Sequence, residues 1–107
     1  MFRISVYVPH AHLEAVKLAM FSAGAGRVGV YDMCCWQTKG EGQFRPLLGS
    51  AAFVGVVDKL ERVAEYKLEM VCVSSYIKQA LIAMQAAHPY EEVAYNVYPV
   101  LTIDDFD

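Results

Sequence analysis

The sequence predicts an α+β domain in which strands and helices follow one another in the order β-α-β-β-α-β. The first observation is an internal repeat at an offset of 64 residues, in which Ile4–Val8 matches Leu68–Cys72. The second is that each of these runs is followed by an amphipathic stripe: Leu13, Val16 and Met20, then Ile77, Ala80 and Met84. Two strand-helix-strand units predict a four-stranded antiparallel sheet with both helices on one face.

The first half begins with an alternating strand that is followed by a helix. Apolar residues alternate from Ile4 to Val8, and Pro9 ends the run, which predicts a strand in a central position. From about Ala11 the apolar period changes to that of a helix, which ends at Ser22-Ala23-Gly24. A second strand is predicted over residues 28–38. The glycines before it are interpreted as a helix cap and a turn, because a phosphate loop requires the strand to come first.

The second half begins with an irregular segment, residues 39–58, which is rich in glycine. It is longer than an ordinary connection, so we expect it to be functional or to form an interface. A third strand is predicted over Arg62–Val73. Ser74 or Ser75 is expected to cap the second helix, and Pro89 to end it at His88. Val93–Val100 is the predicted fourth strand, and a frayed acidic tail is expected from Thr102 to the end.

Composition limits the classes of function. The 107 residues fit one domain, residues 1–107, and 56% of them are hydrophobic, which exceeds the usual 45–50%. No apolar run approaches the length of a membrane span, so the excess predicts a subunit interface in a homo-oligomer. The net charge of −3 and the scattered basic residues argue against nucleic acid as a partner. The three cysteines form no disulfide framework and the N-terminus has no signal-peptide pattern, so a cytoplasmic location is expected.

Four motifs, in order, resemble a known family. They are Gly24-Ala25-Gly26-x-x-Gly29-x-Tyr31-x-x-Cys34, Gly40-x-Gly42-x-Phe44-Arg45-Pro46, Leu60-Glu61-x-x-x-Glu65-x-x-Leu68-Glu69, and His88-Pro89-Tyr90-Glu91-Glu92-x-Ala94-Tyr95. Together they resemble the insert domain of the YqfO branch of the dinuclear-metal-hydrolase-like family, which was first described as a yeast NGG-interacting factor. That insert resembles CutA and PII-type proteins. The resemblance therefore implies a ferredoxin-like, CutA/PII-like fold and a homotrimer formed by joining sheets. The family's catalytic domain and its metal ligands have no counterpart in this sequence, so its hydrolase activity is not implied.

The candidate ligand or interface residues lie in two of these motifs. They are Phe44, Arg45, His88, Tyr90, Glu91 and Glu92. We expect them to line a cleft between subunits, formed by the segment 39–58 and the turn 88–92. The final tyrosines suit an interface because tyrosine buries a large area and keeps a polar tip.

A metal site is the alternative interpretation of the same turn. His88 with Glu91 or Cys34 would bind zinc or copper, because imidazole and thiolate suit these ions. Against this, no ligands have helical or C-x-x-C spacing, and Glu91 and Glu92 on a strand would point to opposite faces. His88 could instead cap the second helix as a cation. His10 and His12 are expected to be neutral and exposed.

Three functions follow as hypotheses. The first is a non-enzymatic, trimeric CutA/PII-like binding or regulatory domain for a small ligand or a protein partner. The second is a CutA-type protein that binds divalent copper or zinc, and the third is an accessory domain that docks on a separate dinuclear-metal hydrolase of the same family. Enzyme activity is not expected, because no nucleophile lies beside a base in the sequence. No membrane partner is expected.

Overall fold

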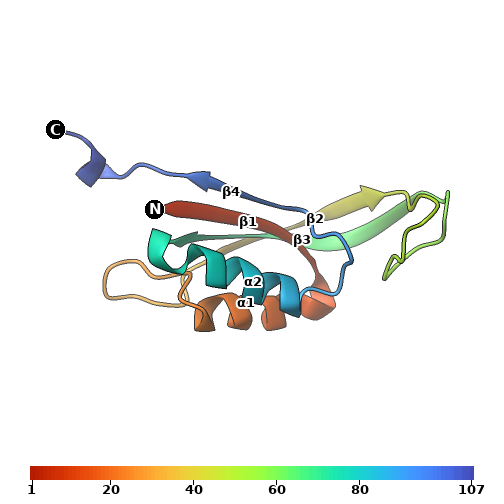
Figure 1. Cartoon of the computed structure of the whole chain (residues 1–107), viewed down its shortest axis with the longest axis horizontal. Coiled ribbons are helices and arrows are strands. Elements are labelled where there is room, and N and C mark those ends of the chain that lie inside the picture. The colour runs from red at the N-terminus through yellow and green to blue at the C-terminus, as the bar shows by residue number, and fades with distance from the viewer.

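The computed structural model describes all residues 1–107 and has the predicted α+β fold. Its elements are β1 (Phe2–Pro9), α1 (Leu13–Ser22), β2 (Trp36–Phe44), β3 (Glu61–Cys72), α2 (Ile77–Ala87) and β4 (Tyr95–Pro99). The strands form one antiparallel sheet in the order β2-β3-β1-β4, and α1 and α2 lie on the same side of it (Figure 1). The order β-α-β-β-α-β and the central position of β1 are therefore confirmed.

The hydrophobic core lies between the sheet and the two helices. Alternate residues of β1, namely Ile4, Val6 and Val8, are fully buried and point toward the helices. The other buried apolar residues are Leu13, Val16, Met20, Ala25, Leu68, Met70, Cys72, Ala80 and Met84. The helices contribute Leu13, Val16, Met20, Ala80 and Met84 from their apolar stripes, and alternate residues of β3 contribute Leu68, Met70 and Cys72. None of the helices is long and apolar enough to span a membrane.

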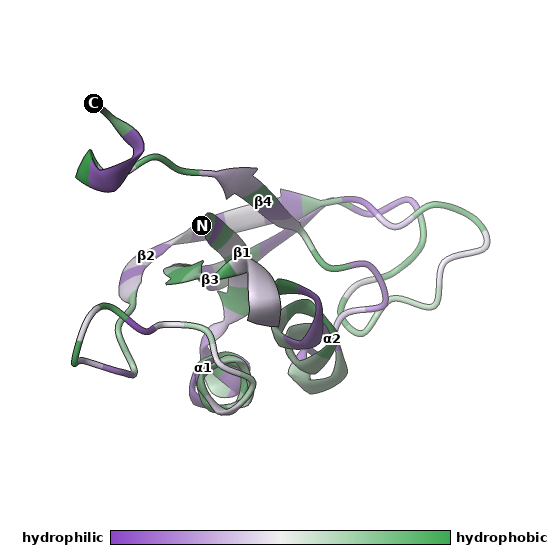
Figure 2. Ribbon diagram, turned by 60° about the vertical axis from the view of Figure 1, so that its left-hand side comes forward, coloured by the Kyte–Doolittle hydropathy of each residue, from purple (hydrophilic) through white to green (hydrophobic).

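The opposite face of the sheet is covered by no helix (Figure 2). The register places Ser5, Glu69 and Trp36 in one row across this face, because paired residues of neighbouring strands point the same way. The Trp36 side chain is 68% exposed, and its indole N–H donates a hydrogen bond to Thr38 two residues along β2. One face of the sheet thus remains available for contact with another chain.

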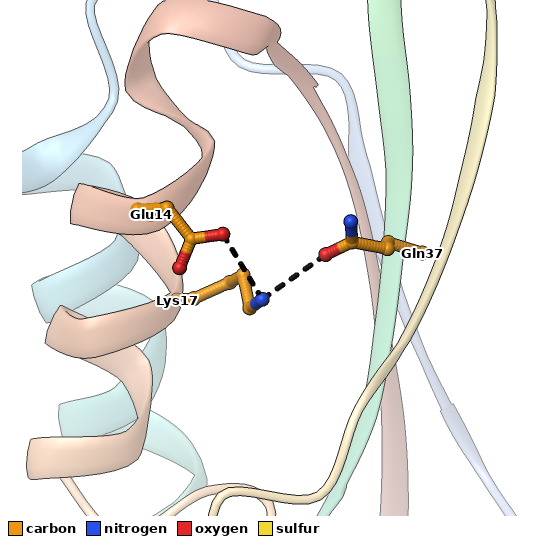
Figure 3. Close-up of polar contacts among 3 residues, drawn as sticks. All are labelled: Glu14, Lys17 and Gln37. Atoms are coloured by element: carbon orange, nitrogen blue, oxygen red, sulfur yellow. Dashed lines mark hydrogen bonds and ion pairs between the residues drawn. The ribbon is translucent and has the colours of Figure 1, made fainter.

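Lys17 joins α1 to the edge strand β2 (Figure 3). Its ammonium group donates to Glu14 at 3.2 Å, within the same helix, and to the amide oxygen of Gln37 at 3.0 Å. The side chain of Gln37 points to the helix face of the sheet, opposite to that of Trp36. The bond agrees with the facing of the β2 side chains that the register with β3 gives.

The predicted position of the second strand is wrong. The structure places β2 at Trp36–Phe44, not over residues 28–38, and only an isolated bridge joins Val28 to Tyr31. The valines and aromatic residues of 28–36 favour a strand locally. The glycine-containing segment Lys39–Phe44 forms one because it pairs with β3 along its whole length, and tertiary pairing overrides local preference.

Three smaller predictions also need correction. The irregular segment is residues 45–60, called the hairpin loop below, because β2 continues to Phe44. Neither Ser74 nor Ser75 caps α2: both lie in a short 3₁₀ turn, and the residue before the helix is Tyr76, which makes no side-chain cap. The acidic tail forms a 3₁₀ turn at Ile103–Asp105, where the Asp105 carboxylate accepts from the Thr102 backbone N–H at 2.7 Å.

The molecule is elongated, with extents of 52 × 26 × 24 Å. The hairpin loop lies at one end of the long axis, and the C-terminal segment lies at the other (Figure 1). The turn that leads from α2 to β4, residues 88–94, approaches the base of the hairpin. It is called the helix-to-strand turn below, and it forms the site.

Candidate ligand pocket

A pocket of about 390 Å³ lies between the hairpin loop and the helix-to-strand turn. Its lining residues are Tyr7, Gln43, Phe44, Arg45, Pro46, Leu47, Ser50, Ala52, Phe53, Val54, Glu65, Tyr90, Glu91, Glu92 and Ala94. They come from β1, β2, β3, the loop and the turn, so the pocket depends on the tertiary fold. Its volume is in the range of small-molecule sites.

His88 holds the helix-to-strand turn against β1. Its backbone is extended, because Pro89 disfavours helical geometry in the preceding residue, and α2 therefore ends at Ala87. The side chain is buried, with only 6% of its surface exposed. The backbone N–H of Tyr90 donates to Nδ1 at 3.2 Å, and Nε2 lies 2.7 Å from the carbonyl oxygen of Tyr7.

These two contacts determine the protonation state of His88. Because Nδ1 accepts a hydrogen bond, the proton of the neutral ring lies on Nε2, which donates it to Tyr7. Burial lowers the pKa of His88 below its ordinary value of 6.5, although the Tyr7 carbonyl and the Glu65 charge act in the opposite direction. The interpretation of His88 as a cationic helix cap is therefore wrong. Its imidazole is a neutral brace that lies behind the pocket and does not line it.

Tyr90 lies at the centre of a group of aromatic side chains. Its ring centroid is 5.0 Å from that of His88, 6.2 Å from that of Phe44 and 6.4 Å from that of Phe53. The hydroxyl oxygen is buried beside the Glu65 carboxylate and accepts no hydrogen bond. Burial, followed by the charge of Glu65, raises the pKa of Tyr90 to about 12, so the phenol is neutral at physiological pH.

Glu91 links the turn to the hairpin loop. Its carboxylate accepts a hydrogen bond from the backbone N–H of Ala51 at 2.6 Å, across forty positions of sequence. A charged acceptor makes this a strong type of hydrogen bond. Glu92 also lines the pocket. The two carboxylates share one site because β4 begins only at Tyr95, so the strand alternation predicted to separate them does not apply.

Glu65 enters the pocket from β3. A Cβ atom at Gly42 would collide with its carboxylate, so the absence of a side chain at Gly42 leaves the space that the Glu65 side chain occupies. Glu65 takes part in none of the ion pairs of the structure, which join Lys17 to Glu14, Arg62 to Glu41 and Lys67 to Glu69. The pocket therefore contains a carboxylate that is in no ion pair.

The structure gathers most of the predicted site residues. Phe44, Arg45, Tyr90, Glu91 and Glu92 all line the pocket, whereas His88 lies behind it. All the lining residues of the pocket come from one chain, and the cleft between subunits stays a prediction. Sequence reasoning did not select Glu65 or Phe53. Glu65 is a fixed residue of the third motif, although its place in a predicted strand did not suggest a site, and Phe53 could have been noted as an aromatic residue within the glycine-rich segment.

The structure does not assemble the proposed metal ligands His88, Glu91 and Cys34. Both ring nitrogens of His88 are engaged, and the Glu91 carboxylate binds Ala51. Cys34 lies before β2, where its thiol faces the carbonyl of Asp32 at 3.5 Å. No group of three or more His, Cys, Asp or Glu side chains is placed to hold a metal ion. His12 also differs from expectation: its ring is partly buried, and it packs edge-on against Phe53.

Comparison with known proteins identifies relatives of the chain. No family model matches it. It is 46% identical over 98 residues to the Bacillus subtilis protein named GTP cyclohydrolase 1 type 2 homolog, in a match that covers 92% of this chain and 26% of the relative. A solved structure, that of a Bacillus cereus protein related to NIF3, has 40% identity and a TM-score of 0.80, covering 92% of this chain and 25% of that one.

A second solved structure extends the similarity of fold. The PII-like protein CutA from a Nostoc species matches with a TM-score of 0.66 at 16% identity, over 94% of this chain and 81% of that one. This supports the CutA/PII-like fold alone. The chain spans about a quarter of the length of the curated relatives that it matches. The chain is therefore similar to one segment of proteins named GTP cyclohydrolase 1 type 2 homolog and of a protein related to NIF3, and it has the CutA/PII-like, ferredoxin-like fold.

Proposed function

We propose that this chain is a non-enzymatic, CutA/PII-like binding domain that assembles as a homotrimer and holds a small ligand in the pocket beside Tyr90. The pocket itself carries the proposal. It is formed by five segments of the chain, it has the size of a small-molecule site, and the bond between Glu91 and Ala51 closes the loop over it.

The chemistry of the lining supports binding rather than catalysis. The lining residues include no cysteine and no histidine. His88, whose ring packs against Tyr90, has both ring nitrogens in hydrogen bonds to the backbone, so it is not free to take a proton from a nucleophile. The aromatic rings and the carboxylates that remain are groups that recognise a ligand.

Exposed apolar side chains at both ends of the molecule support self-association. The hairpin loop exposes Leu47, Leu48 and Phe53 at one end. The loop before β2 exposes Val30, Tyr31 and Met33, and the C-terminal segment exposes Leu101, Ile103 and Phe106. Different surfaces at opposite ends of an elongated chain can cover each other only between copies, and such head-to-tail contacts can close into a ring. The resemblance to CutA and PII-type proteins implies a ring of three.

A fragment screen observed by protein NMR tests ligand binding. We expect fragments to shift the amide resonances of Ala51, Phe53 and Tyr90, because these residues surround the pocket. The Phe53→Ala variant should lose these shifts, since it removes one wall. Phe106→Ala removes an equally exposed phenylalanine from the far end of the chain and should retain them. A screen in which no fragment shifts the pocket resonances would refute the proposed function.

A further inference from the structure

We propose that the ligand of this pocket is a small organic cation, an alkylated ammonium group, held against the rings of Phe44, Phe53 and Tyr90 with Glu65 as its counter-charge. This inference rests on the proposed function, because it names the chemistry of the ligand that the pocket binds.

Three aromatic residues from separate segments meet at the pocket. The rings of Phe44 and Phe53 are tilted to that of Tyr90 by 57° and 47°, with centroids 6.2 and 6.4 Å from its centroid, and all three residues line the pocket. A small ligand in the pocket would therefore lie among aromatic rings from β2, the hairpin loop and the helix-to-strand turn. Ring faces carry negative electrostatic potential and attract cations within about 6 Å of the centroid, which is how proteins recognise quaternary ammonium groups.

The charges around the pocket also favour a cation. The lining includes three carboxylates, those of Glu65, Glu91 and Glu92, and one guanidinium, that of Arg45. Glu91 already binds Ala51. Glu65 is partly buried and in no ion pair, and its charge acts on both Tyr90 and His88. Placing a carboxylate there without a partner is costly, and a bound cation would compensate for that cost.

The Tyr90 hydroxyl indicates how such a ligand would be oriented. Its oxygen is buried, lies beside the Glu65 carboxylate and accepts no hydrogen bond. Its lone pairs are therefore free to accept a hydrogen bond from an N–H group of a tertiary ammonium ion. A cation at this position would contact the ring faces, the hydroxyl and the carboxylate together.

Binding measured by NMR titration with matched probes tests the inference. Choline and protonated N,N-dimethylethanolamine are the cations, and 3,3-dimethyl-1-butanol is the neutral molecule with the shape of choline. We expect each cation to bind at least about tenfold more tightly than the neutral alcohol. The Glu65→Gln variant should lose most of this preference. Glu69→Gln, four residues along the same strand and paired with Lys67, should keep it.

Two outcomes would overturn the inference in different ways. If the neutral alcohol binds as tightly as choline, or Glu65→Gln leaves the ratio unchanged, the ligand is not selected by charge, although the pocket still binds ligands. If no fragment of any charge shifts the pocket resonances, the proposed function fails as well.

Discussion

Replacement of His88 by alanine is expected to lower the free energy of unfolding by about 3 kcal/mol or more. The change removes both hydrogen bonds of the ring, leaving the carbonyl of Tyr7 and the N–H of Tyr90 without partners, and it empties a buried space. Each unsatisfied buried group costs about 1–3 kcal/mol, and the cavity adds to that cost. Because the same ring holds Tyr90, the variant should also lose ligand shifts at the pocket. Urea unfolding followed by circular dichroism measures the stability.

The matched control is His10→Ala. His10 is exposed and makes no hydrogen bond, and its ring contacts only Tyr66, at 5.6 Å between centroids. Its removal should change stability by about 0.5 kcal/mol or less. Equal losses in the two variants would show that His88 is not the brace described here.

Low pH should weaken the hydrogen bond between the Tyr90 N–H and Nδ1 of His88. Protonation would place an N–H on Nδ1, facing the N–H of Tyr90, and burial lowers the pKa of His88 below 6.5. Below about pH 6.5, His88 binds a proton more readily in the unfolded chain than in the folded chain. The contribution of His88 to the free energy of unfolding is therefore fully present above this pH and decreases as the pH falls below it. We expect the free energy of unfolding to decrease between about pH 7.5 and about pH 5.5, with a smaller decrease in His88→Gln, which retains His10 and His12.

Replacement of Gly26 by alanine is expected to cost about 2–4 kcal/mol of stability. Gly26 has a φ of +78°, and a Cβ atom there would lie 2.7 Å from the ring of Phe21 and 2.9 Å from the carbonyl oxygen of Cys34. Its N–H donates to Val71 on β3, and its carbonyl accepts from Cys34. Alanine at this position would therefore be strained in its backbone and would collide with its neighbours. Because Gly26 connects the loop after α1 to the sheet by a hydrogen bond, the change should weaken that connection. Thermal unfolding measures the loss.

The Gly29→Ala variant separates the cost of backbone strain from the cost of steric collision. Gly29 also has a positive φ, +57°, but a Cβ atom there would meet nothing within 4 Å. It should show only the conformational cost, about 1–2 kcal/mol. If Gly26→Ala were no more destabilising than Gly29→Ala, the close packing around Gly26 would be incorrect.

The elements that sequence analysis placed well are those whose side chains form the core. The alternation of Ile4, Val6 and Val8 and the helical stripe through Met20 are burial patterns, and burial is what the structure shows for them. β2 was misplaced because its residues are mostly exposed and its stability comes from pairing with β3. Long-range pairing of this kind leaves no periodic signal in the strand itself.

The site was predictable only in part, because its contacts also join residues that lie far apart in the sequence. The motifs around Phe44 and Tyr90 pointed to segments that the fold brings together. The roles of individual residues did not follow from the motifs. The contact between His88 and Tyr7 spans 81 positions, and Glu65 reaches the pocket from the middle of a strand. Chemical type alone suggested a metal ligand at His88, whereas its hydrogen bonds make it a structural residue.

The proposed self-association would cover the uncovered sheet face and the apolar ends of the molecule, and size-exclusion chromatography with light scattering measures it directly. We expect a species of three times the chain mass of 11.9 kDa. Trp36→Glu, at an exposed position on the uncovered face, should shift the protein toward the monomer. Leu18→Glu, which is 60% exposed on α1, should leave the trimer intact. A wild-type protein that remains monomeric at micromolar concentration would contradict the homotrimer.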